Sequence, residues 1–190
     1  PPTARVGVVG VLAGAKRAGM GFRRPGEVLL LIGEERGELG ASEVLYLLTG
    51  KEFGHPPRLD LGREKAVQEA IRDLIQRGLT RTAHDVAEGG LLLALAEMTF
   101  PYGVGATVEV REEGLEALFG EAPGRVLFTV EKTRLQEATL LLEERGLPYR
   151  VLGETGGKSL TVLTPGGVLE WSLEELLSAW KAPLREVLDG

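Results

Sequence analysis

The sequence has 190 residues, a formal net charge of −6 and no cysteine, and hydrophobic residues make up 43% of it. This length suffices for one domain with a substantial core, and no apolar run is long enough to span a membrane. The acidic balance disfavours a nucleic-acid-binding face. The missing cysteines exclude disulfides and thiolate chemistry, which suits a cytoplasmic protein.

Strands and a loop are predicted at the start of the chain. Valine and glycine alternate over Val6–Leu12, which predicts a buried strand. The stretch 14–26 is rich in glycine and carries four basic residues, so we expect a loop, and favour a solvated connection over the alternative of a phosphate cradle. The apolar run Val28–Ile32 is short and uninterrupted, which is typical of a central strand.

Two helices are expected next, each bounded by capping residues. Ser42 precedes a helix that runs through Leu48 and ends at Gly50. Asp60 precedes a longer helix that ends at Gly78. The apolar residues of this longer helix recur with the helical period, so we expect them to form core rather than a cofactor site.

The second half of the chain alternates predicted strands and helices. The strands are expected at 81–86, 106–110, 125–130, 149–152, 159–163 and 168–171. Helices are expected at 91–98, from a capping box at Thr133–Gln136 to Arg145, from a capping box at Ser172–Glu175 to Trp180, and from Pro183 onward. The strand–helix–strand unit around Thr133–Arg145 has the length of a crossover connection. Together these elements predict one α/β domain with a mixed sheet.

The richest motif runs from His84 to Gly90, directly ahead of an apolar helix. A glycine pair lets the backbone turn sharply or approach a ligand, and the first N–H groups of a helix favour an anion. His84, Asp85, Glu88, Gly89 and Gly90 are therefore candidates for lining a phosphate or nucleotide pocket. The alternative is that Asp85 only caps local amides, because a glycine pair is also an ordinary way to enter a helix. The residues alone leave both open.

Other candidate sites are weaker. Arg125 begins a predicted strand, where it could bind a phosphate through two N–H groups or simply lie on the surface. The segment 156–159, Gly-Gly-Lys-Ser, lacks the flanking glycine of a Walker A loop and leads into a strand, so we reject it as a phosphate loop. His55 is expected to be exposed, and its distance in sequence from His84 gives no metal-ligand spacing. No metal site is predicted.

The motif, continued by Ala-Leu-Ala-Glu-Met at 94–98, resembles the C-terminal domain of the phosphoribosylformylglycinamidine synthases, also called formylglycinamide ribonucleotide amidotransferases. They belong to the superfamily of aminoimidazole ribonucleotide synthetase. Further segments agree in order and cover essentially the whole chain, namely 2–12, 25–33, 38–43, 121–126 and 153–157. The resemblance implies a three-layer α/β/α sandwich with a mixed sheet. It also implies that residues 1–190 form the second C-terminal-type domain of a duplicated pair, with upstream domains missing, as the start at Pro1 suggests.

The resemblance implies an activity for the parent protein. Enzymes of this family use ATP to convert formylglycinamide ribonucleotide and glutamine-derived ammonia to formylglycinamidine ribonucleotide in purine biosynthesis. ATP and Mg²⁺ are then expected mainly outside this chain, which would hold no catalytic residue and be inactive alone. The expected partners are the upstream domains and, because the chain stops at Gly190, a separate glutaminase and a small bridging subunit. Neither nucleic acid nor membrane is expected.

The same resemblance implies a degenerate site. The family's first copy has Gln-Asp where this chain has His84-Asp85, and Glu-Ser-Gln where it has Glu121-Ala122-Pro123. Alanine and proline side chains offer no donor or acceptor, so they cannot reproduce the family's substrate contacts. This copy would then line an auxiliary nucleotide pocket or serve as structural support. The alternative for the whole chain is a non-catalytic nucleotide-binding, phosphate-binding or structural module of a related synthetase.

Overall fold

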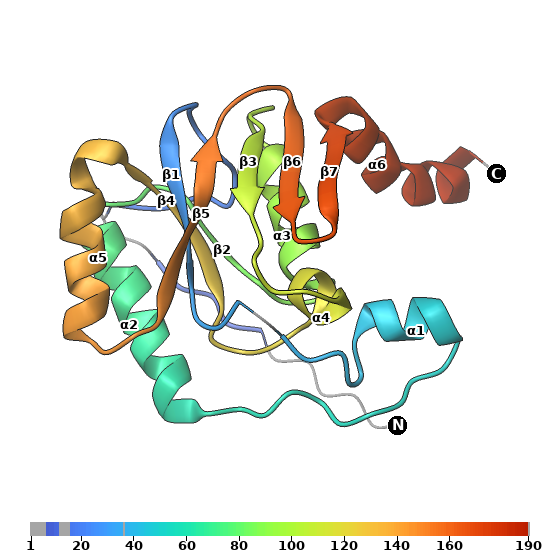
Figure 1. The fold of residues 1–190 in the computed structure, drawn as a ribbon, viewed down its shortest axis with the longest axis horizontal. Coiled ribbons are helices and arrows are strands. Elements are labelled where there is room, and N and C mark those ends of the chain that lie inside the picture. The colour runs from blue at the N-terminus through green and yellow to red at the C-terminus, as the bar shows by residue number, and fades with distance from the viewer. Residues whose placement is uncertain (1–6, 12–15, 36, 190) are drawn as a thin grey trace.

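The computed structural model describes residues 7–11, 16–35 and 37–189 (Figure 1). Its strands are β1 (Glu27–Ile32), β2 (Ala83–Asp85), β3 (Ala106–Glu109), β4 (Val126–Glu131), β5 (Tyr149–Thr155), β6 (Ser159–Thr164) and β7 (Gly167–Ser172). Its helices are α1 (Glu43–Thr49), α2 (Leu61–Arg77), α3 (Gly90–Thr99), α4 (Leu115–Phe119), α5 (Leu135–Glu144) and α6 (Leu173–Asp189), and a 3₁₀ turn over Lys132–Arg134 precedes α5. Most elements lie within a few residues of their predicted positions; the short helix α4 was not predicted.

The strands form one mixed sheet in the order β2-β4-β1-β5-β3-β6-β7. Strands β3 and β6 are parallel, and the other neighbours are antiparallel. Because β4 and β5 both run antiparallel to β1, they are parallel to each other, and α5 makes the predicted crossover between them. All six residues of β1 are buried, as its apolar run predicts for an interior strand.

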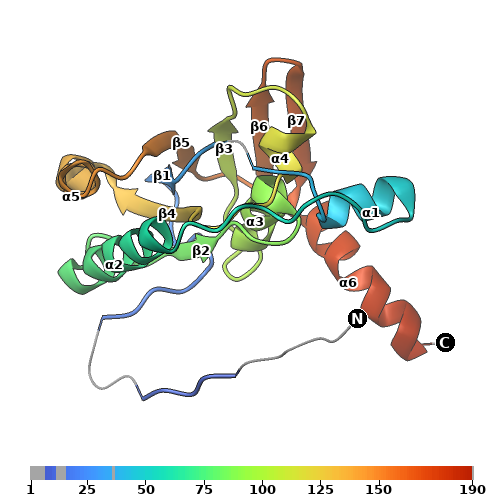
Figure 2. The ribbon, with the colours of Figure 1, turned by 90° about the horizontal axis from the view of Figure 1, so that it is seen from below.

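Helices cover both faces of the sheet and give three layers (Figures 1 and 2). Alternate residues of a strand point to opposite faces, so Leu29 of β1 faces α3 while Leu30 faces α2 and α5. Leu91 of α3 joins the first core, and Leu74 of α2 joins the second. The predicted three-layer α/β/α sandwich with a mixed sheet is confirmed. No described helix is both long and apolar enough to span a membrane.

The predicted capping residues lie at both ends of α1 and of α2. The Leu45 N–H donates to Ser42 Oγ at 3.3 Å, and the Arg63 N–H donates to Asp60 Oδ1 at 3.0 Å. Both helices end at a glycine in the left-handed conformation, with φ of 67° at Gly50 and 70° at Gly78. These side-chain and glycine caps satisfy backbone groups that a helix end leaves unpaired.

The strand predicted at 6–12 is absent from residues 7–11, the part of this stretch that the structure describes. Residues 7–11 form no strand, and Val8, Val9 and Val11 are 91%, 99% and 98% exposed. This segment runs apart from the folded body, where no described strand lies beside it to complete a ladder (Figure 2). Positions 6 and 12 lie outside the described residues.

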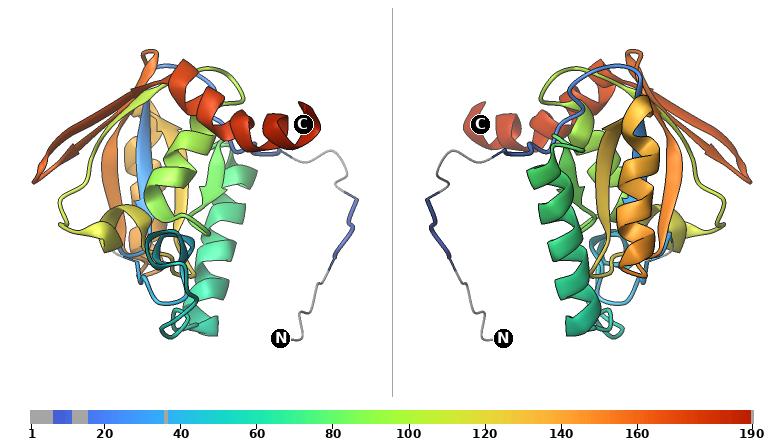
Figure 3. Two further views of the ribbon diagram at one scale, coloured as in Figure 1. Left: turned by 90° about the vertical axis from the view of Figure 1, so that its right-hand side faces the viewer. Right: turned by 90° about the vertical axis from the view of Figure 1, so that its left-hand side faces the viewer.

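Two predictions about helix ends are wrong. No capping box forms at Thr133, because the 3₁₀ turn comes first and Arg134 occupies the cap position without a side-chain cap bond. Helix α6 is one helix with Pro183 inside it, where two helices were predicted. Proline removes one backbone bond, and α6 projects from the body there, so water can reach the freed carbonyl (Figure 3). The capping box at Ser172 is confirmed, since the Glu175 N–H donates to Ser172 Oγ at 3.1 Å.

Candidate functional site

Three of the segments that carry the family resemblance meet at one end of the sheet. Loops 38–43 and 121–125 are joined by paired backbone bonds between Glu38 and Glu121, at 3.0 and 2.8 Å. The turn that follows β2 joins them, because the Val86 N–H donates to the Arg125 carbonyl at 2.9 Å. Segment 153–157 instead lies at the other end of β1 and has a structural role. There the Thr155 hydroxyl donates to the Arg24 carbonyl at 2.7 Å.

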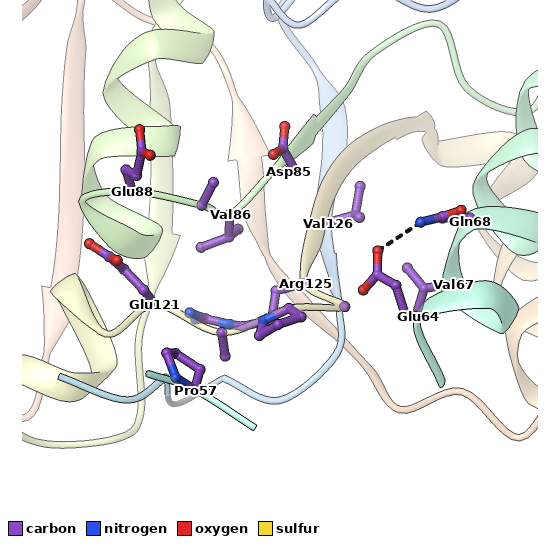
Figure 4. Close-up of a pocket in the computed structure, with 14 residues that line it drawn as sticks. Pro57, Glu64, Val67, Gln68, Asp85, Val86, Glu88, Glu121, Arg125 and Val126 are labelled. Atoms are coloured by element: carbon purple, nitrogen blue, oxygen red, sulfur yellow. Dashed lines mark hydrogen bonds between the residues drawn. The ribbon is translucent and has the colours of Figure 1, made fainter. Parts of the chain in front are cut away.

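A pocket of about 340 Å³ opens between these loops and α2 (Figure 4). Of the six candidate residues, Asp85, Glu88 and Arg125 line it. His84, Gly89 and Gly90 lie beside it without lining it. We call this hollow the acidic pocket, because four carboxylates line it: Glu64, Asp85, Glu88 and Glu121.

The charge of the acidic pocket is unfavourable for a phosphate. Glu64 accepts a hydrogen bond from Gln68 through one carboxylate oxygen, at 2.9 Å, and its other oxygen is buried without a partner. An unpaired buried acceptor favours a donor or a cation over an anion. Within the described ranges, however, no three His, Cys, Asp or Glu side chains are grouped so that they could hold a metal ion.

The glycine pair enters α3 in the left-handed conformation, with φ of 76° at Gly89 and 69° at Gly90. The Gly89 N–H donates to a carboxylate oxygen of Glu121 at 2.9 Å, and the same oxygen accepts from the Glu43 N–H at 3.1 Å. A carboxylate of the chain itself therefore accepts from the cap amide of α3, one of the N–H groups that a helix start could offer to a phosphate. A Cβ on Gly90 would lie 2.5 Å from the backbone of Phe119, so this glycine serves the packing of α3 against α4.

Arg125 is a buried structural residue and not the surface residue that its position at a strand start suggested. It is only 2% exposed, and its three guanidinium nitrogens donate to the carbonyls of Glu34, Gly120 and Glu35 at 2.9, 2.7 and 2.6 Å. Burial lowers the pKa of Arg125 to about 10, which leaves it charged at neutral pH. The side chain thus ties the loop after β1 to the loop before β4.

His84 is held between two carboxylates. Its Nε2 lies 2.9 Å from Glu97 of α3, and its Nδ1 lies 3.3 Å from Asp85. The Asp85 side chain is 75% exposed and bonds to no backbone amide of the described residues, and the cap position of α3 is Gly89. The alternative that Asp85 caps local amides is therefore wrong. His55 is exposed, as predicted.

Two of the four carboxylates that line the acidic pocket, Glu64 and Glu121, were not among the sequence candidates. Glu64 lies on α2, twenty-one positions before Asp85, and nothing local distinguishes it from the other polar residues of that helix. Glu121 stands in a segment that carries the resemblance, but its bonds to the Gly89 and Glu43 amides depend on how three loops meet. The one sequence signal for Glu121 was its position directly before Ala122-Pro123, the pair that replaces Ser-Gln of the family's first copy.

Comparison with known proteins places the chain in a family. Residues 24–164 match the family described as AIR synthase related protein, C-terminal domain, and the chain belongs to this family. Over all its 190 residues it is 97% identical to the phosphoribosylformylglycinamidine synthase subunit PurL of Thermus thermophilus, of which it covers 26%. It is 44% identical over 184 residues to the subunit of the same name from Moorella thermoacetica, covering 95% of this chain and 25% of that protein. The chain thus spans about a quarter of these relatives, and the resemblance drawn from its motifs is confirmed.

Solved structures share the fold. PurL of Thermotoga maritima complexed with FGAR has a TM-score of 0.74 at 20% identity, over 84% of this chain and 29% of that one. The same protein complexed with ATP has a TM-score of 0.67 at 21% identity, over 84% and 27%. The hydrogenase maturation protein HypE in complex with ATP is more distant, with a TM-score of 0.53 at 20% identity over 83% and 52%. At these identities the likeness concerns the fold alone.

Proposed function

We propose that this chain is the second C-terminal-type domain of the synthetase subunit of phosphoribosylformylglycinamidine synthase, and that it supports the enzyme structurally. The parent protein would be the ATP-dependent ligase that forms formylglycinamidine ribonucleotide from formylglycinamide ribonucleotide and ammonia in de novo purine biosynthesis. The identity of 97% along the whole chain to a subunit of that name supports this proposal.

The single observation that carries the structural role is the position of Glu121. Its carboxylate takes the Gly89 and Glu43 N–H groups that would otherwise receive a phosphate. Glu64, Asp85 and Glu88 add further negative charge to the same pocket. This charge disfavours a nucleotide phosphate, and with it the Mg²⁺ that the phosphate would bring. ATP and Mg²⁺ are therefore proposed to bind in the upstream domains.

Exposed apolar side chains support the proposal that other parts of the parent cover this domain. Leu47 and Leu48 of α1 are 78% and 64% exposed, and Val187 of α6 is 79% exposed. Together with residues 7–11 they form apolar surface that a protein standing alone seldom leaves in water. The proposed partners are the upstream domains, a separate glutaminase and a small bridging subunit, all in the cytoplasm. A related structure described as PurLQS from Thermotoga maritima is in keeping with such an assembly.

Activity measurements on the chain and on the parent test the proposal. The chain alone should form no amidine from the ribonucleotide, ATP and ammonium, whereas the purified parent subunit should use ammonium but not glutamine. Changing Asp85→Asn and Glu88→Gln together in the parent should leave kcat and KM within about threefold of wild type. Amidine formation by the chain alone would overturn the proposal. Binding of ADP that Asp85→Asn removes would instead favour a nucleotide-binding module.

A further inference from the structure

A second hollow lies at the other end of β2, beyond Arg81. It encloses about 460 Å³ between the loop before β1, the end of α2 and the start of α5. We call it the basic pocket, because six of its lining side chains are cationic and none is acidic: Lys16, Arg17, Arg23, Arg77, Arg81 and Arg134. Such a concentration of positive charge is unexpected in a chain whose net charge is −6.

Four of these cations have no partner among the described residues. No ion pair or hydrogen bond is recorded for the side chains of Lys16, Arg17, Arg77 and Arg81, whereas most other arginines pair with a carboxylate or a carbonyl. Like charges that gather without counter-charges repel one another. An anion bound between them would remove that repulsion.

A purely structural role at the end of α2 does not account for the cluster. Cations near a helix C-terminus are favourable, but several of the carbonyls there already have partners. The Leu79 N–H donates to the Leu74 carbonyl at 2.8 Å, and Arg134 donates to the Gly78 carbonyl at 3.2 Å. Arg23 lies over the Tyr102 ring, 5.4 Å from its centre, which leaves Lys16, Arg17, Arg77 and Arg81 to face a ligand.

We propose that the basic pocket binds the polyphosphate group of a small molecule. Guanidinium groups bind phosphate oxygens through paired N–H donors, and the hollow has the size of a small-molecule site. Besides the cations only Gly78 and Thr80 line it, so it offers no apolar wall for a base or another apolar group. The phosphates, and not the group attached to them, are the recognised part. A concave site on an acidic chain suits a compact anion better than an extended nucleic acid.

Calorimetric titration of the chain in the absence of divalent metal tests this site. Inorganic tripolyphosphate should bind at least about tenfold more tightly than orthophosphate, because it can contact several cations at once. ATP should bind within about threefold of tripolyphosphate, and both affinities should fall as ionic strength rises. Absence of tripolyphosphate binding would overturn the proposal. An affinity for ATP far above that for tripolyphosphate would also overturn it, since recognition would then rest on the nucleoside.

Substitutions at Arg77 of α2 and at Arg81, which follows that helix, test whether tripolyphosphate binds in the basic pocket. Arg77 and Arg81 are exposed, so the double variant Arg77→Gln, Arg81→Gln should keep its fold and lose about 100-fold in affinity for tripolyphosphate. The control Lys65→Gln, Arg72→Gln changes the net charge equally at exposed positions of α2 outside the pocket and should bind normally. Equal loss in both variants would mean that only the overall charge matters. Arg81→Gln alone, with an unchanged circular dichroism spectrum, repeats the test with less risk to the fold.

Discussion

The two pockets at opposite ends of β2 differ in whether the chain itself supplies partners for the donor groups that could bind a phosphate. At the acidic pocket, Arg125 donates only to backbone carbonyls, and Glu121 accepts from the Gly89 N–H at the start of α3 and from the Glu43 N–H at the start of α1. At the basic pocket, four cationic side chains have no recorded partner among the described residues. The motif that suggests phosphate binding lies at the first pocket, and the unpaired cations lie at the second. A glycine motif therefore indicates a ligand only when its amides are free.

The difference also predicts how substitutions act. Gly90, Arg125 and Glu121 hold together loops that meet at the acidic pocket, so replacing them should lower the free energy of unfolding. The side chains of Arg77 and Arg81 are exposed at the basic pocket, so replacing them should change ligand affinity and hardly affect stability.

The largest expected effect is that of Gly90→Ala, compared with Gly50→Ala. Both glycines are left-handed, at φ of 69° and 67°, so each substitution should cost about 1–2 kcal/mol from backbone strain alone. A Cβ at Gly50 meets nothing within 4 Å, whereas one at Gly90 lies 2.5 Å from the Phe119 backbone. We expect Gly90→Ala to lose about 2 kcal/mol more, measured by urea unfolding. Equal losses would show that α4 does not constrain the turn.

Arg125→Lys should follow, with a loss of about 2–4 kcal/mol in the free energy of unfolding. A lysine keeps the charge but cannot reach the three carbonyls of Glu34, Glu35 and Gly120 from one planar group. The matched control is Arg81→Lys at the basic pocket, where we expect a change within about 0.5 kcal/mol. Chemical denaturation of both variants gives the comparison. A small loss at Arg125 would mean that the guanidinium bonds add little to the fold.

Glu121→Gln should cost about 1–2 kcal/mol, because a neutral amide accepts a weaker hydrogen bond than the carboxylate that now receives the Gly89 and Glu43 N–H groups. Glu88→Gln removes the same charge from the same pocket, at an exposed side chain with no recorded bond, and should be nearly neutral. Thermal unfolding at neutral pH measures both variants. If the two variants lose equally little stability, the charge of the Glu121 carboxylate does not strengthen its hydrogen bonds with the Gly89 and Glu43 N–H groups.

The elements were predictable where local chemistry decides them. The apolar run of β1, the caps Ser42 and Asp60 and the glycines at 50 and 78 each act within a few residues, and the structure agrees at each. Thr133 and Pro183 show the limit of local rules. At Thr133, a 3₁₀ turn forms where the helix cap was expected. At Pro183, the helix continues through the proline because the position is exposed.

The chemistry of the pockets was less predictable, because it depends on contacts between segments distant in sequence. Arg125 bonds to residues about 90 positions away, so its burial could not be foreseen from a strand start. The basic pocket combines the loop 16–23, the end of α2 and the start of α5. The loop was noted as basic, but nothing in the sequence indicated that Arg77 and Arg134 would lie beside it.

His84→Ala should have the smallest effect on the parent enzyme. His84 is enclosed by Glu97 and Asp85 and does not line the acidic pocket, so its loss should cost about 1 kcal/mol of stability and less than threefold in kcat/KM of the full-length subunit. The conservative variant His84→Gln, which keeps a donor toward Glu97, should recover part of the stability while leaving turnover as it is. Thermal unfolding of the chain and steady-state kinetics of the parent with ammonium measure the two effects separately. A fall in kcat by orders of magnitude in a folded His84→Ala enzyme would place His84 in the working site, and this end of β2 would then be catalytic rather than structural.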